Sequence, residues 1–420
     1  MTSPEVVAAI ADVESSAAAN KAAAYSQLLD KIFASSPGEE ALAANLKAYV
    51  ESILGDSLGI VSSRPLLANF VERFAELRDK PDVVIDVGEH ALRLLEPKVV
   101  SYEEQDTRLK LAVAGAHEAS DDFAASARTL QKISLDSSQR AVTADEKADV
   151  WIRIVRCYLE EDDPTSATGY LNRTKNILHD VTNPLSKLMF TLCQARIHDS
   201  RRSFLDASTT YHSVSQSRLI GEDEQLLALS AAMTCAVLAP AGPQRARALA
   251  RLYKDDRAAT VDEHPILEKI FLDRLLDPAE VDAFAAKLKP HQLAKTADGS
   301  TVLQKAVVEH NLLAVSKLYA NIGFDGLGVL LNVDAARAES YAAQMIEQGR
   351  LAGHIDQIDR LIVFEGEGSG ERKTAHGEGV FGRELMAWDR NVEALAEEVE
   401  RVSTKIQNQY PEFYAEHMVQ

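Results

Sequence analysis

Cysteine is scarce in this sequence, which contains three cysteines in 420 residues. Cys157, Cys193 and Cys235 lie far apart, and each falls within an apolar pattern of helical spacing. A disulfide framework or a zinc cluster needs cysteines at close or regular spacing, so the sequence indicates neither. We expect three small buried residues in a reducing compartment.

Long hydrophobic runs are also missing. No stretch of about 18 apolar residues occurs anywhere, which predicts that no helix crosses a membrane. The first residues, Met1 to Glu5, have no basic region ahead of an apolar run, so no secretory leader is predicted. We expect a protein of the cytoplasm and the nucleus.

Positive charge is in short supply. The chain has 45 Lys and Arg against 64 Asp and Glu, and its formal net charge is −19. Nucleic acids and anionic membranes attract basic surfaces, so this balance disfavours both as partners. It is typical of a protein whose partners are other proteins.

Catalytic motifs are absent from the chain. Gly377 to Gly382 matches the dinucleotide fingerprint, but no strand-turn-helix unit surrounds it, and we interpret it as part of a linker. The acidic run Glu160 to Asp163 has no nitrogen ligand beside it and is interpreted as a solvated turn. The histidines show no HExxH pattern, and no GxSxG or P-loop occurs. The sequence therefore predicts no catalytic residue, no bound cofactor and no metal.

A weak helical repeat is present in the first part of the chain. The pairs Asp122-Phe123, Asp163-Pro164 and Ser203-Phe204 stand 41 and 40 residues apart, and an apolar helical pattern precedes each. Paired helices repeating at about 34–47 residues are typical of a solenoid. We predict a mainly α protein with a right-handed helical-repeat (TPR/HEAT-like) solenoid over residues 1–298, clearest at 105–215.

Residues 299–365 have the pattern of a winged helix. An apolar stripe from Leu303 to Ile322 predicts a long helix that ends at Gly323. Phe324 to Leu331 forms a two-turn helix, and a third helix follows with Asp334 as N-cap. The stretch from Leu351 to Phe364 is rich in aliphatic residues and is broken at Asp359-Arg360, which predicts a β-hairpin wing. The third helix is net acidic, so DNA binding is disfavoured.

The end of the chain has the sharpest periodicity. After a glycine-rich linker at residues 366–385, a helix is predicted over residues 386–420. Its apolar residues step by four, three, four, three and four, which is the spacing of a heptad seam: Trp388, Val392, Leu395, Val399, Val402 and Ile406. Such a narrow seam needs a partner helix. Packing against its own domain is an alternative that the sequence leaves open.

A helical solenoid that leads into a winged helix and a C-terminal helix resembles the PCI-domain family. This family supplies scaffold subunits to the proteasome lid, the COP9 signalosome and translation initiation factor three, and the match is close to a signalosome member. The segments that carry the resemblance include Val100–Gln105, Tyr158–Pro164, Phe204–Ala207, Leu252–Arg257, Leu267–Arg274, Glu309–Leu313 and Ile355–Asp359.

The resemblance implies a non-catalytic scaffold in a complex that removes a ubiquitin-like modifier from cullins. Its partners would be other signalosome PCI subunits, the metalloprotease subunit pair and cullin-RING ligases, and it would help relay substrate binding to the metalloprotease. The wing strand, Leu361, Ile362, Val363 and Phe364, would offer an edge to a neighbouring subunit, and the heptad seam would join a helical bundle. The first alternative is a scaffold subunit of the proteasome lid, and an RNA-binding adaptor is the second.

Overall fold

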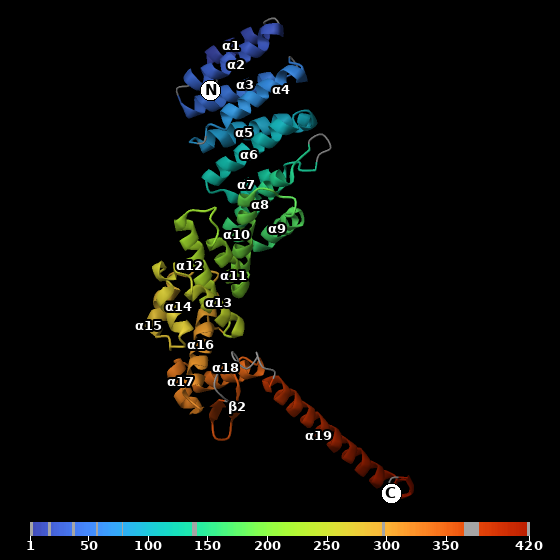
Figure 1. Cartoon of the computed structure of the whole chain (residues 1–420). Coiled ribbons are helices and arrows are strands. Elements are labelled where there is room, and N and C mark those ends of the chain that lie inside the picture. The colour runs from blue at the N-terminus through green and yellow to red at the C-terminus, as the bar shows by residue number, and fades with distance from the viewer. Residues whose placement is uncertain are drawn as a thin grey trace. The chain divides into compact units, whose positions relative to one another are not determined.

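The computed structural model describes residues 3–15, 18–35, 38–55, 58–77, 79–136, 141–295, 299–364 and 378–417. The chain forms two compact units, Met1–Ala228 and Leu229–Gln420. Helices dominate both, and a small sheet is found in the second unit (Figure 1). The predicted fold class, a mainly α chain with a helical repeat ahead of a winged helix, is confirmed.

The first unit is a series of helices that are stacked in chain order from α1 to α9 in Figure 1. Their bounds are α1 (Pro4–Ser15), α2 (Ala18–Ser35), α3 (Glu39–Leu54), α4 (Ile60–Phe74), α5 (Pro81–Leu95), η1 (Glu96–Ser101), α6 (Glu103–Ala119), α7 (Phe123–Gln131), α8 (Ala144–Glu160), α9 (Pro164–Ile177), α10 (Pro184–Ser200) and α11 (Phe204–Ser215). The three predicted repeats are the hairpins α6–α7, α8–α9 and α10–α11.

Each of these hairpins turns through the same backbone conformation. Asp121, Asp162 and Arg202 have φ values of 59°, 55° and 61°, which is the left-handed region. In each case the next residue donates its N–H to a carbonyl five residues earlier, as in Asp163 N to Tyr158 O at 2.9 Å. This is a Schellman-type helix ending. The acidic run at residues 160–163 is therefore a turn, as predicted.

Two of the turns also start the following helix with an aspartate cap. The Asp122 carboxylate accepts the N–H of Ala125, and the Asp163 carboxylate accepts those of Thr165 and Ser166. A hydrogen bond from the Ser166 side chain, together with the N–H bonds of Ser166 and Thr165, lowers the pKa of the Asp163 carboxyl. Capping of this kind is worth about 1 kcal/mol per helix and fixes where each second helix begins.

Successive hairpins are joined by similar ion pairs. Glu118 of α6 accepts from Arg153 of α8 at 2.7 Å, and Glu160 of α8 accepts from Arg196 of α10 at 2.9 Å. Each pair is partly exposed and adds at most about 1 kcal/mol. The two pairs occupy similar positions in successive hairpins.

The apolar cores of the first unit are linked through shared helices. Leu109 of α6 belongs to the core built by α1 to α6, whereas Ala114 of the same helix belongs to the core of α6, α7 and α8. At the crossing of α5 and α6, a Cβ added to Gly88 would come 2.2 Å from Val113 Cγ2. The two helices therefore approach more closely there than any other residue would allow.

The second unit begins within α12 (Glu222–Leu238). It continues through α13 (Pro243–Tyr253), η2 (Ala258–Thr260), α14 (His264–Phe271) and α15 (Pro278–Ala285). The boundary that the sequence predicted at residue 298 is therefore displaced to residue 228 in the structure. The reason is contact with the winged helix: His310 Nε2 bonds the carbonyl of Arg274 at 2.9 Å, and Leu276 N donates to Asn311 Oδ1 at 3.0 Å.

The winged helix is built from α16 (Val302–Leu318), β1 (Asn321–Gly323), α17 (Phe324–Leu331), α18 (Ala335–Glu347), β2 (Gly353–Asp356) and β3 (Leu361–Phe364). Thr301 and Gln304 form a capping box at the start of α16. The strands form one antiparallel sheet in the order β1-β3-β2. Ile322 pairs with Ile362, and Ile355 pairs with the same residue from the other side.

Two predictions about this domain are corrected. The long helix ends at Leu318 rather than Gly323, because Tyr319 has an extended backbone with φ −114° and ψ 140°. The residues that follow form β1, a strand that the sequence did not predict. Ile322 fits the helical stripe by spacing, but it is held by β3 instead.

The C-terminal helix begins earlier than predicted. α19 spans Glu378–Gln409 and is followed by α20 (Pro411–His417). The last part of the predicted linker is thus helical, since Phe381 and Leu385 extend the spacing of the seam toward the N-terminus. The rest of that linker, residues 366–377, lies outside the described residues.

Candidate functional site

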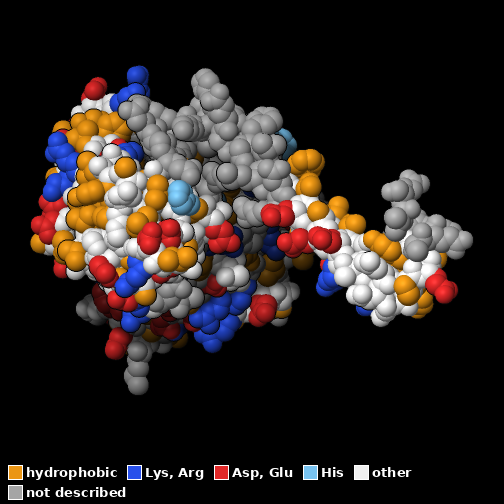
Figure 2. Space-filling view, turned by 90° about the horizontal axis from the view of Figure 1, so that it is seen from below, with side chains coloured by type: hydrophobic (Ala, Val, Ile, Leu, Met, Phe, Trp, Pro, Cys, Tyr) orange, Lys and Arg blue, Asp and Glu red, His pale blue; other side chains and the backbone are white. Residues whose placement is uncertain are grey.

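The heptad seam of α19 lies at the protein surface. Its first five residues have exposed fractions between 44% and 65%: Trp388, Val392, Leu395, Val399 and Val402. Ile406 is half-buried. Figure 2 shows hydrophobic side chains (orange) at the surface along this helix. A contiguous exposed apolar stripe is typical of a surface that another protein covers.

The other faces of α19 are charged. Glu397, Glu398 and Glu400 are exposed, and Arg401 pairs with Glu398 one turn earlier on the helix. Polar faces around one apolar stripe favour docking on a single side. The arrangement matches what the sequence predicts for a helix in a bundle, although the partner-binding role of these residues stays a prediction.

The apolar surface continues past the predicted seam. Tyr410 is 64% exposed and lies between α19 and α20, where its N–H donates to the carbonyl of Ile406 at 2.7 Å, and Phe413 of α20 is 52% exposed. The seam predicted from the sequence ends at Ile406 and does not contain these two residues. The signal was available, because Phe413 stands one heptad after Ile406 and Tyr410 stands four residues after it.

The order of the strands corrects the prediction that residues 361–364 form an edge strand of the wing. β3 lies between β1 and β2, so both of its edges already carry ladder partners. Ile362 and Phe364 point into the core of the winged helix, while Leu361 and Val363 are half-buried. These four residues therefore cannot accept an added strand. Any role in binding a partner would be indirect, through the sheet that they hold together.

The outer strands of the sheet are β1 and β2. β2 is the longer, with four residues, and its outer side has no sheet partner among the described residues. The hairpin turn beside it exposes Ile358, whose exposed fraction is 93%. An outer strand next to an exposed aliphatic side chain is a typical template for strand addition. The outer edge of β2, in place of β3, is therefore the candidate site for strand addition by a partner.

A buried histidine of the winged helix forms a hydrogen bond to the segment that follows α14. His310 of α16 is 3% exposed. Burial, followed by the nearby Arg245 cation, lowers the pKa of its imidazole to about 4, although the bond to Arg274 O and the Asp273 carboxylate act in the opposite direction. The ring is therefore neutral at physiological pH and acts as a structural hydrogen-bonding group.

The cysteines are buried free thiols, as predicted. Burial raises the pKa of Cys157 and of Cys193 to about 11, so neither provides a thiolate near neutral pH. Within the described ranges, no three His, Cys, Asp or Glu side chains are grouped closely enough to hold a metal ion. Nor does any helix in those ranges have the length and apolarity needed to cross a membrane.

The comparisons with known proteins agree with this arrangement. The family described as "PSMD12/CSN4, N-terminal" matches residues 5–223, and the family described as "PCI domain" matches residues 270–366. The chain is 51% identical to COP9 signalosome complex subunit 4 of Emericella nidulans, covering 97% of this chain and 98% of the relative. The same subunit of Neurospora crassa is 48% identical over 98% of each chain, and that of Arabidopsis thaliana is 40% identical over 83% of this chain and 86% of the relative.

Proposed function

Because the chain belongs to the PCI-domain family of COP9 signalosome subunit 4 proteins, we propose that it is a non-catalytic scaffold of a signalosome that deneddylates cullin-RING ligases. It joins that complex through two surfaces of its second unit. The first is the apolar seam of α19, extended by Tyr410 and Phe413. The second is the outer edge of β2.

The exposed seam is the observation that carries this proposal. Five large apolar side chains on one face of α19 are about half exposed or more. Covering such a side chain is worth roughly 1.5–3 kcal/mol when it becomes fully buried. Exposed apolar faces of this kind mark interaction sites, and a helical bundle formed with further subunits would cover this one.

The partners in this proposal are the other PCI subunits, the metalloprotease subunit pair and the cullin-RING ligases. The scaffold contributes no reacting group. Its solenoid helps relay the binding of a ligase to the metalloprotease, and the complex operates in the cytoplasm and the nucleus. The identity of 40–51% to signalosome subunits over most of the chain supports this assignment over a proteasome-lid subunit with the same architecture.

Affinity purification of the tagged chain tests the proposal. The expected eluate contains a metalloprotease subunit and removes the modifier from a neddylated cullin in vitro. The free chain, purified alone, should have no such activity. Recovery with proteasome-lid subunits would instead support the alternative, and recovery of the chain alone or with RNA would contradict both.

A further inference from the structure

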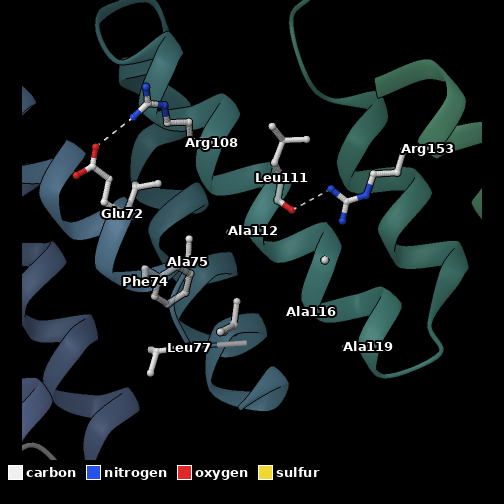
Figure 3. A pocket seen from close by; sticks show the side chains of 13 residues that line it. Glu72, Phe74, Ala75, Leu77, Arg108, Leu111, Ala112, Ala116, Ala119 and Arg153 are labelled. Carbon is white, nitrogen blue, oxygen red and sulfur yellow. Dashed lines mark hydrogen bonds and ion pairs between the residues drawn. The ribbon is translucent and has the colours of Figure 1, made fainter. Parts of the chain in front are cut away.

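One apolar hollow of the first unit is a groove along α6. Its volume is about 620 Å³, and its walls come from the end of α4, from α5 and from α8. The side chains that line it are mostly aliphatic or aromatic, including Val71, Phe74, Leu77 and Leu111. Figure 3 shows Phe74 and Leu77 on one side and the α6 residues Ala112, Ala116 and Ala119 facing them.

The floor of this groove allows a close approach. Ala112, Gly115, Ala116 and Ala119 follow one another on one face of α6 and all line the hollow. Small side chains at helical spacing let the backbone of a second helix come nearer than large ones do. The floor extends over two turns of α6, which is long enough to seat one face of a short helix.

The charged residues that line the hollow are two arginines and one glutamate, although the whole chain is strongly acidic. Glu104 and Glu118, which contact these arginines, lie outside the lining. Two arginines, Arg108 and Arg153, frame the groove together with one glutamate, Glu72. Arg108 lies 3.6 Å from Glu72 in an exposed pair, as the dashed line in Figure 3 marks, and also contacts Glu104 at 2.7 Å. Exposed pairs of this kind are weak, so a partner's carboxylate can replace either of them.

Arg153 reaches from α8 across the floor. Its Nε donates to Glu118 at 2.7 Å and its Nη1 to the carbonyl of Leu111 at 3.4 Å. Its Nη2 lies over Gly115, 3.2 Å from where a Cβ would be, and has no acceptor among the residues that the structure describes. A half-buried guanidinium nitrogen above an apolar floor favours a carboxylate as its partner.

We propose that this groove is a docking site for an acidic amphipathic helix of a partner protein. The aliphatic side chains of that helix fill the hollow over Ala112 and Ala116. A glutamate or aspartate beside them binds Arg153 Nη2, and a second acidic side chain binds Arg108. This site is separate from the α19 seam and does not depend on the proposed function of the complex.

The test uses the full chain and a defined probe. The probe is a capped 18-residue helical peptide, with leucine at every third or fourth position and glutamate on both flanks of the leucine stripe. Its binding is measured by fluorescence anisotropy, and the bound region by hydrogen–deuterium exchange. We expect protection of residues 108–119 and at least tenfold weaker binding of the same peptide with lysine in place of glutamate.

Two variants separate the groove from general effects. Arg153→Met removes the guanidinium from the groove, and we expect it to weaken peptide binding about tenfold. Arg196→Met is the matched control, because it breaks the equivalent ion pair of the next hairpin at 2.9 Å without touching the groove. It should change the affinity less than about twofold. Ala119→Leu, at an exposed position, should block the end of the groove while the melting temperature stays unchanged.

Three results would overturn the proposal. The first is equal affinity for the glutamate and the lysine peptides. The second is an equal loss of binding in the Arg153→Met and Arg196→Met variants. The third is protection that maps to α19 or to another surface instead of to α4, α6 and α8.

Discussion

Arg350 holds the buried carboxylate of Glu309 with both of its terminal nitrogens, Nη2 reaching Oε1 at 3.0 Å and Nη1 reaching Oε2. The Glu309 side chain is 2% exposed and that of Arg350 is 16% exposed. The pair also ties in the chain before α13, because Ala241 N donates to Glu309 and Ala241 O accepts from Arg350. Three segments far apart in sequence thus meet at one ion pair.

Breaking this pair should destabilise the second unit. We expect Arg350→Met to lower the free energy of unfolding by about 3–5 kcal/mol, because it leaves a buried carboxylate without its cation. Urea unfolding of the full chain measures the loss. Arg360→Ser is the control, since the pair of Arg360 with Asp325 is long at 3.5 Å and exposed. A similar loss in both variants would contradict the importance of the buried pair.

Charges on the seam of α19 should prevent assembly without unfolding the chain. The variant Leu395→Glu with Val399→Glu puts two carboxylates on the apolar stripe, and we expect recovery of partner subunits to fall at least tenfold. Glu397→Gln with Glu400→Gln, on the charged faces, serves as the matched control. Circular dichroism should give the same helix content for both. Normal assembly of the first variant would exclude the seam as the contact.

Removal of the whole C-terminal helix is the stronger form of the same test. A chain that ends at residue 385 should keep the helical repeats folded and should lose incorporation into the complex. An unchanged assembly profile on size exclusion would contradict the role proposed for α19.

The centre and the tip of the wing should respond differently to charge. Ile362 is fully buried in β3, so Ile362→Asp should cost about 3 kcal/mol or more and lower the melting temperature. Ile358→Asp, at a side chain that is 93% exposed, should leave stability within about 0.5 kcal/mol. If Ile358→Asp nevertheless weakens assembly, the hairpin beside β2 takes part in the contact.

Acidification should weaken the second unit through His310. Its pKa is about 4 in the folded chain, below the ordinary value of 6.5, so below pH 6.5 the unfolded chain binds a proton that the folded chain does not. Stability is therefore complete above about pH 6.5 and falls as the pH drops toward 4, by up to about 1.4 kcal/mol per unit from this group. The substitution His310→Gln should remove this contribution to the dependence of unfolding free energy on pH. Parallel urea titrations at pH 7.5 and 5.0 compare the two proteins.

Two helical glycines should respond in opposite ways to alanine. At Gly88 the added Cβ would meet Val113 Cγ2 at 2.2 Å, and we expect a loss of about 1–3 kcal/mol from overpacking. At Gly169, in α9, an added Cβ would have no atom within 4 Å outside its chain neighbours and its own helix backbone. Alanine there should raise the free energy of unfolding by about 0.5–1 kcal/mol through its higher helix propensity. Thermal unfolding of the two variants gives the sign of each change.

Much of the fold was predictable because its signals are local. The hairpin turns at Asp162 and its equivalents follow from turn and cap residues at a fixed spacing. The two-turn helix Phe324–Leu331 and the hairpin that ends at Phe364 likewise have local signals, and both are present as predicted.

What could not be predicted depends on contacts between distant residues. Ile322 fits a helical stripe, but its pairing with Ile362, forty residues later, converts it to strand. The same pairing makes β3 a central strand, which moved the candidate edge to β2. The groove along α6 was equally hidden, because α4, α5, α6 and α8 contribute to it from four separate helices. Local periodicity contains no information about such neighbours.

The hairpin turns at Asp121, Asp162 and Arg202 also have a mechanical consequence. They recur at intervals of 41 and 40 residues and end each first helix in the same way, so the three hairpins from α6 to α11 contain nearly equal lengths of chain. A pulling force along the chain would meet one hairpin at a time, since each is held mainly by its neighbours. Extension would then proceed in even steps of about 140 Å, the contour length of one hairpin. Under load, such a series of hairpins would unfold in several steps instead of in a single event.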